Sequence, residues 1–293
     1  MKKLLIVALI MLSAFAADAQ VSAPGGYDWR DSSVVPPARM QQHFEFMNNQ
    51  YNFPAQPRSQ WELGVKVGTP TVNGDVDAVF PGVGFGVHAR KSLGYLVSLR
   101  GEYSYGVSRG LGERFINVPT TLNPAWSAYP SGKLYYNYKT SVSQFLISGI
   151  ISLNNISFHK AEPKALLYGL FGAGFMIYDT KLDALNGSTP YNFSEGMSKA
   201  NIRAMLDGSY ETNAVKFGNR LKPTLSLGFG AQFKISNKVN ISIEDRVSFS
   251  KDDYLDGVKY YYPVSTTGAR IAAITPQYDA INFLSLGINI NLF

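Results

Sequence analysis

The sequence contains no cysteine, and only 3 of its 293 residues are histidine. The absence of cysteine excludes disulfide bonds and a lipid-modified cysteine near the N-terminus. Together with the few histidines, it argues against a zinc site. No basic cluster accompanies the formal net charge of +6, so we do not expect the chain to bind nucleic acid.

Long apolar runs are also scarce. The run from Leu4 to Ala17 follows two lysines and ends in a small-residue cleavage site, which predicts a secretory signal peptide over residues 1–19. That run is too short to span a membrane comfortably, because spanning takes about 20 residues. No other continuous apolar segment of about 18 residues follows, so the sequence argues against a helical membrane protein.

Alternation of apolar and polar residues is what the sequence has in abundance. Eight stretches show it, with 18 Tyr and 18 Phe in the chain, near residues 61–69, 82–91, 95–105, 138–153, 164–178, 224–235, 239–249 and 278–293. Because successive side chains of a strand point to opposite faces, each stretch predicts a strand with one apolar face. No helices are left over to cover these faces. The sequence therefore predicts an all-β fold, an eight-stranded antiparallel transmembrane up-and-down β-barrel whose apolar exterior faces lipid.

The predicted connections alternate in length. Those near residues 92–94, 154–163 and 236–238 are short, and those near 70–81, 107–137, 179–219 and 251–277 are longer. Outer-membrane barrels have short periplasmic turns and long outer loops. We therefore expect a bacterial outer-membrane location with both termini in the periplasm, and Trp61 and Tyr95 at the periplasmic edge.

Residues 20–59 are rich in Pro, Gly and Gln and are predicted to form a periplasmic extension before a barrel of residues 60–293. We interpret this extension as loosely ordered. Alternatively, Pro36-Pro37 could start a short helix with one face formed by Met40, Phe44, Met47 and Tyr51. In the third long loop, Ser194 could cap a helix that contains Ile202.

The strand pattern sends a set of charged side chains into the barrel, with Gln232 among them. They are Glu62, Lys66, His88, Arg90, Arg100, Glu102, Lys234, Glu244 and Arg246. Side chains fill the interior of an eight-stranded barrel, and buried charges are costly unless paired. We therefore predict a lumenal ion network that plugs the barrel, with pairs such as Glu102 with Arg90 or Arg100. The alternative is a narrow conduction path that opens when the pairs exchange.

Two acidic features lie outside this network. Asp245 falls on the outward face of its strand, which either a β-bulge or a position at the lipid headgroups would explain. The segment Lys251–Gly257 has three acids and a glycine, so calcium binding is conceivable. Its spacing does not match the twelve-residue calcium loop, and we interpret it as a solvated turn.

The histidines offer little for catalysis. His43 precedes the barrel, His159 lies in a predicted periplasmic turn, and His88 is interpreted as a hydrogen-bonded structural residue. A general base needs a nucleophile within hydrogen-bonding reach, and no motif places one. We therefore expect a non-enzymatic protein with no catalytic residue, cofactor or metal ion.

Several segments resemble OmpA/OprF-type outer-membrane proteins of Bacteroidota. They are Trp61–Val65 with Gly74–Val76, His88–Tyr95, Leu153–Ala161, Ile243–Arg246, Lys251–Gly257 and Tyr278–Phe293. The resemblance covers nearly all of residues 60–293 and implies a barrel that anchors the protein in the outer membrane. That family also has a separate C-terminal domain that binds peptidoglycan. We do not expect the tethering role here, because the chain stops at Phe293, where the linker to that domain would begin. Phe293 is also one residue out of step with the lipid-facing residues Leu292 and Ile290.

The sequence thus predicts a structural, anchoring or assembly-partner role in contact with outer-membrane lipid. A protein partner would bind through the extension or the long outer loops. Three alternatives stay open at this point. They are a small pore or gated channel, a lipid-modifying barrel enzyme with His88 as its base, and an accessory subunit of a secretion or uptake complex that binds through residues 20–59.

Overall fold

The computed structural model describes residues 30–56, 60–78, 80–94, 96–117, 127–129, 132–154, 165–214, 220–236, 238–261, 273–274 and 278–292. The predicted signal peptide, Tyr95, His159 and Phe293 lie outside the described residues.

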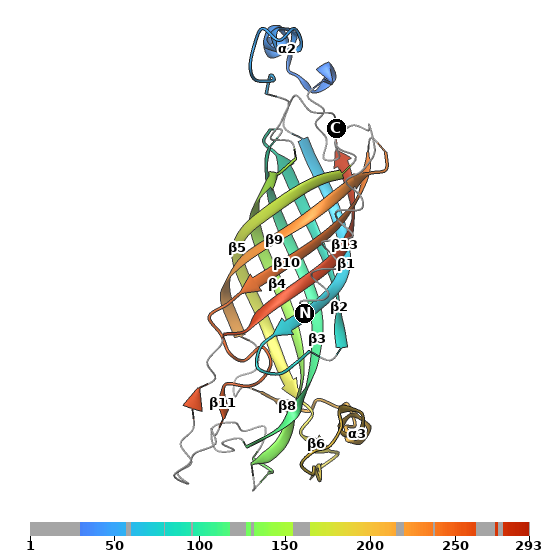
Figure 1. Cartoon of the computed structure of the whole chain (residues 1–293), viewed down its shortest axis with the longest axis vertical. Coiled ribbons are helices and arrows are strands. Elements are labelled where there is room, and N and C mark those ends of the chain that lie inside the picture. The colour runs from blue at the N-terminus through green and yellow to red at the C-terminus, as the bar shows by residue number, and fades with distance from the viewer. Residues whose placement is uncertain are drawn as a thin grey trace.

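Eight long strands form a closed antiparallel barrel (Figure 1). In chain order they are β1 (Gln60–Asn73), β2 (Phe80–Ser92), β3 (Val97–Asn117), β4 (Lys133–Ser152), β5 (Ala165–Leu182), β9 (Arg220–Lys234), β10 (Val239–Phe249) and β13 (Ala280–Leu292). Each strand pairs with the next long strand along the chain, and pairing of β1 with β13 closes the ring. This up-and-down order confirms the predicted fold class.

The alternation of residues gives the barrel an apolar outside and a polar inside. Val65 pairs with Ile288 on the outer face, where the two side chains are 57% and 53% exposed, whereas the neighbouring Lys66 is buried. Exposed large apolar side chains recur along all eight strands. A soluble monomer rarely exposes so extensive an apolar surface, and a closed barrel satisfies its backbone hydrogen bonds without water. The barrel is therefore a transmembrane one.

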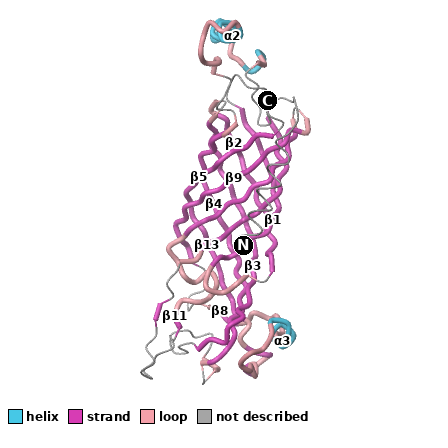
Figure 2. The backbone as a smooth tube through the Cα atoms, viewed as in Figure 1, coloured by secondary structure: helices cyan, strands magenta, loops and turns pink. Residues whose placement is uncertain are grey.

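The two ends of the barrel differ. Helix α2 (Met40–Met47) lies beyond one end, where β13 finishes and the short connections from β2 to β3 and from β9 to β10 turn (Figure 1). The opposite end carries α3 (Lys199–Met205), β8 (Thr212–Asn213) and β11 (Tyr260–Tyr261), as Figure 2 shows. Strand β6 (Leu185–Asn186) lies there too (Figure 1) and pairs with β7 (Thr189–Pro190), and β11 pairs with β12 (Ala273–Ile274). Among the helices that the structure describes, none has both the length and the apolar character needed to cross a bilayer.

Part of the N-terminal extension is helical. Two short 3₁₀ helices, η1 (Ser32–Val34) and η2 (Pro37–Arg39), precede α2. His43 and Phe46 of α2 are buried, while Phe44 and Met47 are exposed. The helical alternative is thus confirmed for residues 37–47, and the interpretation as loosely ordered is wrong for these residues. Of the predicted apolar face, Phe44 and Met47 are exposed and Met40 is half-buried, whereas Tyr51 lies beyond the end of α2.

The helix in the third long loop begins later than predicted. Ser198, not Ser194, caps α3, because its Oγ accepts a hydrogen bond from the Asn201 backbone N at 3.3 Å. Ile202 is fully buried against Leu111 of β3 and Tyr135 of β4. This contact holds α3 against the outer wall and explains why β3 and β4 extend beyond their predicted ends near residues 105 and 138.

Candidate functional site: the lumenal ion network

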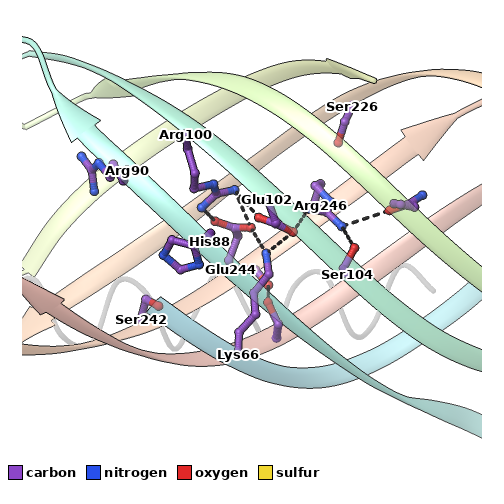
Figure 3. Close-up of polar contacts among 12 residues, drawn as sticks. Lys66, His88, Arg90, Arg100, Glu102, Ser104, Ser226, Ser242, Glu244 and Arg246 are labelled. Atoms are coloured by element: carbon purple, nitrogen blue, oxygen red, sulfur yellow. Dashed lines mark hydrogen bonds and ion pairs between the residues drawn. The ribbon is translucent and has the colours of Figure 1, made fainter. Parts of the chain in front are cut away.

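Five charged side chains meet inside the barrel (Figure 3). They come from three strands and are all buried: Lys66 of β1, Arg100 and Glu102 of β3, and Glu244 and Arg246 of β10. In the ring, β2, β1 and β13 separate β3 from β10. The side chains of β3 and β10 therefore meet across the lumen rather than along one wall.

Arg100 and Glu244 form the central contact. The Arg100 Nη1 donates to Glu244 Oε2 at 2.6 Å, and Nη2 donates to Oε1 at 3.0 Å. Such a two-point contact fixes the guanidinium and the carboxylate relative to each other. The Lys66 Nζ lies 3.0 Å from Glu244 Oε1 and 2.7 Å from Glu102 Oε1, so it connects both acids.

Arg246 extends the network toward the α3 end. It forms an ion pair with Glu102, and its Nη2 donates to Ser104 Oγ and to Gln144 Oε1, each at 3.1 Å. The partners come from β3 and β4, so one guanidinium joins β10 to two strands of the facing wall. The ring of Phe283 lies 5.6 Å from both the Lys66 Nζ and the Arg246 guanidinium carbon, within the range of cation–π contact.

A second group of polar side chains lies toward the α2 end. The Arg90 Nη1 donates to Gln232 Oε1 at 3.0 Å, and the Gln232 Nε2 donates to Glu62 Oε2 at 2.6 Å. Glu62 Oε1 also lies 3.9 Å from both Arg90 Nη1 and His88 Nε2. Gln232 therefore connects Arg90 to Glu62 by two hydrogen bonds, whereas the direct distance between Arg90 and Glu62 is 3.9 Å.

The predicted residues divide into those that meet and those that do not. Glu102 pairs with Arg100, at 3.2 Å between Oε2 and Nη2, whereas the alternative pair of Glu102 with Arg90 is wrong because Arg90 turns to Gln232 and Glu62. Lys234 is half-buried and makes no ion pair with the described residues. It lies at the last position of β9, beyond the reach of the central acids.

Two residues of the lumenal ion network, Tyr168 and Phe283, were not predicted from the sequence. The Tyr168 hydroxyl donates to Glu244 Oε2 at 2.9 Å, and Phe283 points inward although its strand neighbours there are polar. Tyr168 lies on β5, where apolar and polar residues alternate poorly, so its direction could not be read from the pattern. The position of Phe283 on the otherwise polar face of β13 is the feature of the sequence that indicates its inward direction.

Asp245 faces outward in unbroken strand register. It pairs with Phe229 on β9 and with Leu284 on β13, and both ladders continue through it without a shift. Of the two explanations for Asp245, the β-bulge is therefore wrong. The Asn282 Nδ2 donates to Asp245 Oδ1 at 2.6 Å, which offsets part of the cost of an outward carboxylate. A position at the level of the lipid headgroups stays a prediction.

His88 has no catalytic arrangement. Its ring makes no hydrogen bond with a hydroxyl among the described residues, and its nearest acid contact is the 3.9 Å approach to Glu62. The expectation of a hydrogen-bonded histidine is therefore wrong for the described part of the chain. His88 instead fills space against Gly64, where an added Cβ would lie 2.3 Å from its Cε1.

The acidic segment at the α3 end is buried, so the interpretation of Lys251–Gly257 as a solvated turn is wrong. Asp256 is fully buried, with its Oδ1 accepting from the Val258 N and its Oδ2 from the Val76 N, both at 2.9 Å. Asp279 accepts from the Leu255 N at 2.8 Å. The carboxylates thus organise the backbone of this loop over the mouth of the barrel.

The stability of this loop should depend on pH. Burial raises the pKa of Asp256 to about 7, and burial together with repulsion from Asp256 raises the pKa of Asp279 to about 9. Since an unfolded aspartate titrates near 3.8, the folded loop keeps protons that the unfolded chain has released. Its stability is therefore complete below about pH 4 and falls progressively toward about pH 9. We expect the amide protection factors of residues 255–258 to fall over that range in hydrogen-exchange measurements.

The matched variant for this prediction is Asp279→Asn, which keeps an acceptor oxygen and removes the titration of residue 279, while Asp256 still titrates near pH 7. Its protection factors should therefore fall less than those of the wild type between about pH 7 and pH 9. An identical pH profile in the wild type and in Asp279→Asn would contradict the assignment.

A cluster of three acids in the third long loop could offer metal ligands. The carboxylates of Asp183, Asp207 and Glu211 lie within 4.8 Å of one another. However, Asp183 accepts from the Tyr191 hydroxyl at 2.7 Å and the Gly208 N at 2.8 Å, and Glu211 accepts from backbone amides at 2.8 and 3.0 Å. These donors already satisfy the carboxylates, and the cluster holds the loop together.

Comparison with known proteins gives similarity to solved barrel structures. No model of a protein family matches the chain. No curated protein matches it either. Ail, the attachment invasion locus protein of Yersinia pestis, is 14% identical with a TM-score of 0.36, covering 80% of this chain and 97% of that chain. Neisserial surface protein A is 10% identical with a TM-score of 0.36, covering 80% and 99%.

A third similar structure is the N-terminal β-barrel domain of Pseudomonas aeruginosa OprF. It is 9% identical with a TM-score of 0.31, and the match covers 80% of this chain and 100% of that domain. The fold assignment of the present chain rests on its own strand pairing and closure.

Proposed function

We propose that this chain is a non-enzymatic β-barrel of the bacterial outer membrane, with a structural, anchoring or assembly-partner role and a lumen closed by ion pairs. The observation that carries the proposal is the contact between Arg100 and Glu244, which joins opposite walls of the barrel with hydrogen bonds of 2.6 and 3.0 Å. Lys66 contacts both Glu244 and Glu102, and Arg246 pairs with Glu102 beside this contact. Each of these five charged side chains contacts one of opposite sign, so none of the five is a free charge that would attract a permeating ion.

The proposal includes an orientation. Residues 1–19 would be removed as a signal peptide, residues 20–59 would form a periplasmic extension, and residues 60–293 would form the barrel. Short turns in such barrels are periplasmic and long loops are external. The end that carries α2 and the end of β13 would therefore face the periplasm, and the end that carries α3 would face outward.

Conductance tests the closed lumen. In planar bilayers, the wild-type protein should give no discrete current steps, whereas the double variant R100A/E244A should give them because it removes the central contact from both walls. The control is E113A/K199A, which removes an ion pair between β3 and α3, joined at 2.6 Å outside the lumen, and should stay silent. Regular current steps from the wild type would favour the alternative of a small pore or gated channel.

One observation favours a role as an accessory subunit. Phe44 and Phe53 of the extension are 56% and 64% exposed, and Met47 and Tyr51 are exposed beside them. Apolar side chains gathered in this way commonly mark an interaction surface. A photo-crosslinking residue at position 44 should then trap a periplasmic partner in cells, while one at exposed Gln41 should not; equal labelling from both positions would count against this role.

A further inference from the structure

Three cationic side chains form one row on the outer wall of the barrel, toward the α3 end. Strand pairing sets Arg109 of β3 opposite Lys139 of β4, and Lys139 opposite Lys181 of β5. All three occupy outward positions, with Arg109 and Lys181 exposed and Lys139 half-buried. Like charges directly opposite each other destabilise a strand pair. The row therefore costs stability unless something outside the barrel neutralises it.

The described chain does not supply that neutralisation. None of the three residues forms an ion pair with a carboxylate among the described residues. The nearest outward acid along these strands is Asp179, which pairs with Ser141 in the row closer to the apolar wall. Within the described residues, the aromatic contact of the row is that of the Lys139 Nζ, 5.7 Å from the centre of the Tyr210 ring. Among the described residues, the three positive charges of the row are therefore not compensated by Asp179.

The row lies at the height where lipid headgroups are expected. On β3 and β4, twelve residues separate Arg109 and Lys139 from the exposed apolar residues Val97 and Ile151 near the α2 end. Twelve residues of a strand tilted by about 40° rise about 30 Å along the barrel, which matches the thickness of the hydrocarbon core. Farther along the wall, α3 and its loop cover Leu111 and Tyr135. The three cations therefore lie between the lipid-facing wall and the loop that covers the strands above it.

We propose that Arg109, Lys139 and Lys181 bind the phosphate group of a membrane-lipid headgroup in the outer leaflet. Phosphate offers several acceptor oxygens, which a guanidinium can bind at two points and two ammonium groups can bind as point charges. The acyl chains of the same lipid would lie along the apolar side chains below the row, such as Phe145 and Ile177, which are exposed. The inference rests on the membrane orientation proposed above, but it is independent of whether the lumen is closed.

Native mass spectrometry of the full chain in detergent micelles tests this site. We expect the wild type to retain dioleoyl phosphatidic acid in preference to dioleoyl phosphatidylcholine, whose phosphate is masked by choline. Each basic side chain near an anionic headgroup strengthens binding by about fivefold, so R109Q/K139Q/K181Q should weaken phosphatidic acid binding by about a hundredfold. Lys139→Gln alone should weaken it by about fivefold, and Lys139→Arg should leave it unchanged.

The control variant is Lys91→Gln, which removes a single outward cation near the α2 end, 5.3 Å from the Trp61 ring. It should bind phosphatidic acid as the wild type does. A shift in gel mobility on heating verifies that each variant is folded. If the triple variant does not fold, Lys181→Gln, which changes an exposed side chain, replaces it in the test.

Equal binding by the wild type and the folded row variants would overturn the proposal. Displacement of the lipid by an equal concentration of inorganic phosphate would overturn the lipid assignment. Current steps in planar bilayers would contradict the closed lumen and leave this result unaffected.

Discussion

Replacing Glu244 with glutamine is expected to lower the free energy of unfolding by about 3–5 kcal/mol, because removing one partner of a buried ion pair leaves an uncompensated charge. In the wild type Glu244 accepts from Arg100 and Tyr168 and lies 3.0 Å from the Lys66 Nζ. In the variant, Glu102 would be the remaining acid for Lys66, Arg100 and Arg246. Equilibrium unfolding by urea in phospholipid vesicles measures the difference.

Two comparisons make this test specific. Glu113→Gln removes an exposed acid paired with Lys199 and should cost less than about 1 kcal/mol. R100Q/E244Q removes both members of the central pair and should be less destabilised than Glu244→Gln alone. A loss below about 1 kcal/mol for Glu244→Gln would mean that water screens the lumen, and that result would favour the pore.

The substitution Gly174→Ala is expected to disrupt the pairing of β4 with β5. A Cβ at position 174 would lie 1.9 Å from the Phe145 carbonyl oxygen and 2.9 Å from the Leu146 Cα. Both atoms belong to the backbone of β4, and Leu146 is the direct partner of Gly174 in the ladder. The strands must separate to admit the methyl group, so we expect a loss of about 3 kcal/mol in the free energy of unfolding. The same vesicle unfolding assay measures it.

Gly169 provides the matched control on the same strand. A Cβ there would meet no atom within 4 Å, so Gly169→Ala should be neutral or slightly stabilising, because alanine loses less conformational entropy than glycine on folding. Equal stability of the two alanine variants would show that β4 and β5 can adjust to the added methyl group.

The pattern of residues predicts the barrel well because its information is local. Successive side chains of a strand point to opposite faces, so the neighbouring residues alone predict that Val65 points outward and Lys66 inward. The same rule sends Glu102 and Arg246 inward. The ends of β3 and β4 could not be predicted in this way, because their extension depends on contact with Ile202 in a distant loop.

The pairs within the lumen could not be predicted from the sequence. Arg100 and Glu244 are 144 residues apart, and their contact depends on the number of strands and on the stagger of the closed ring. Several basic residues point into the lumen for each acidic one, so the alternation of side chains alone does not predict which base pairs with which acid. The geometry of the closed ring places Glu102 in contact with Arg100 and Arg246. It places Arg90 in contact with Gln232.

The burial of residues 251–257 could not be predicted from the sequence for a related reason. Taken alone, its acids suggest that the segment is solvated. However, Asp279, immediately before β13, accepts a hydrogen bond from the Leu255 N and holds the segment against the barrel. The Thr180 hydroxyl also donates to the Leu255 carbonyl oxygen, at 3.3 Å. A polar composition therefore does not distinguish a solvated turn from one that folds over a barrel.

The central contact also bears on how the protein reaches its final state. Arg100 lies on an early strand, whereas its partner Glu244 lies on the seventh strand of the ring in chain order. A chain already embedded in lipid without β10 would leave Glu102 as the one acid of the network for both Lys66 and Arg100. One positive charge would then be uncompensated in a medium of low polarity, which is costly. Membrane insertion and ring closure should therefore occur as one concerted event, and a chain truncated before β10 should remain at the bilayer surface.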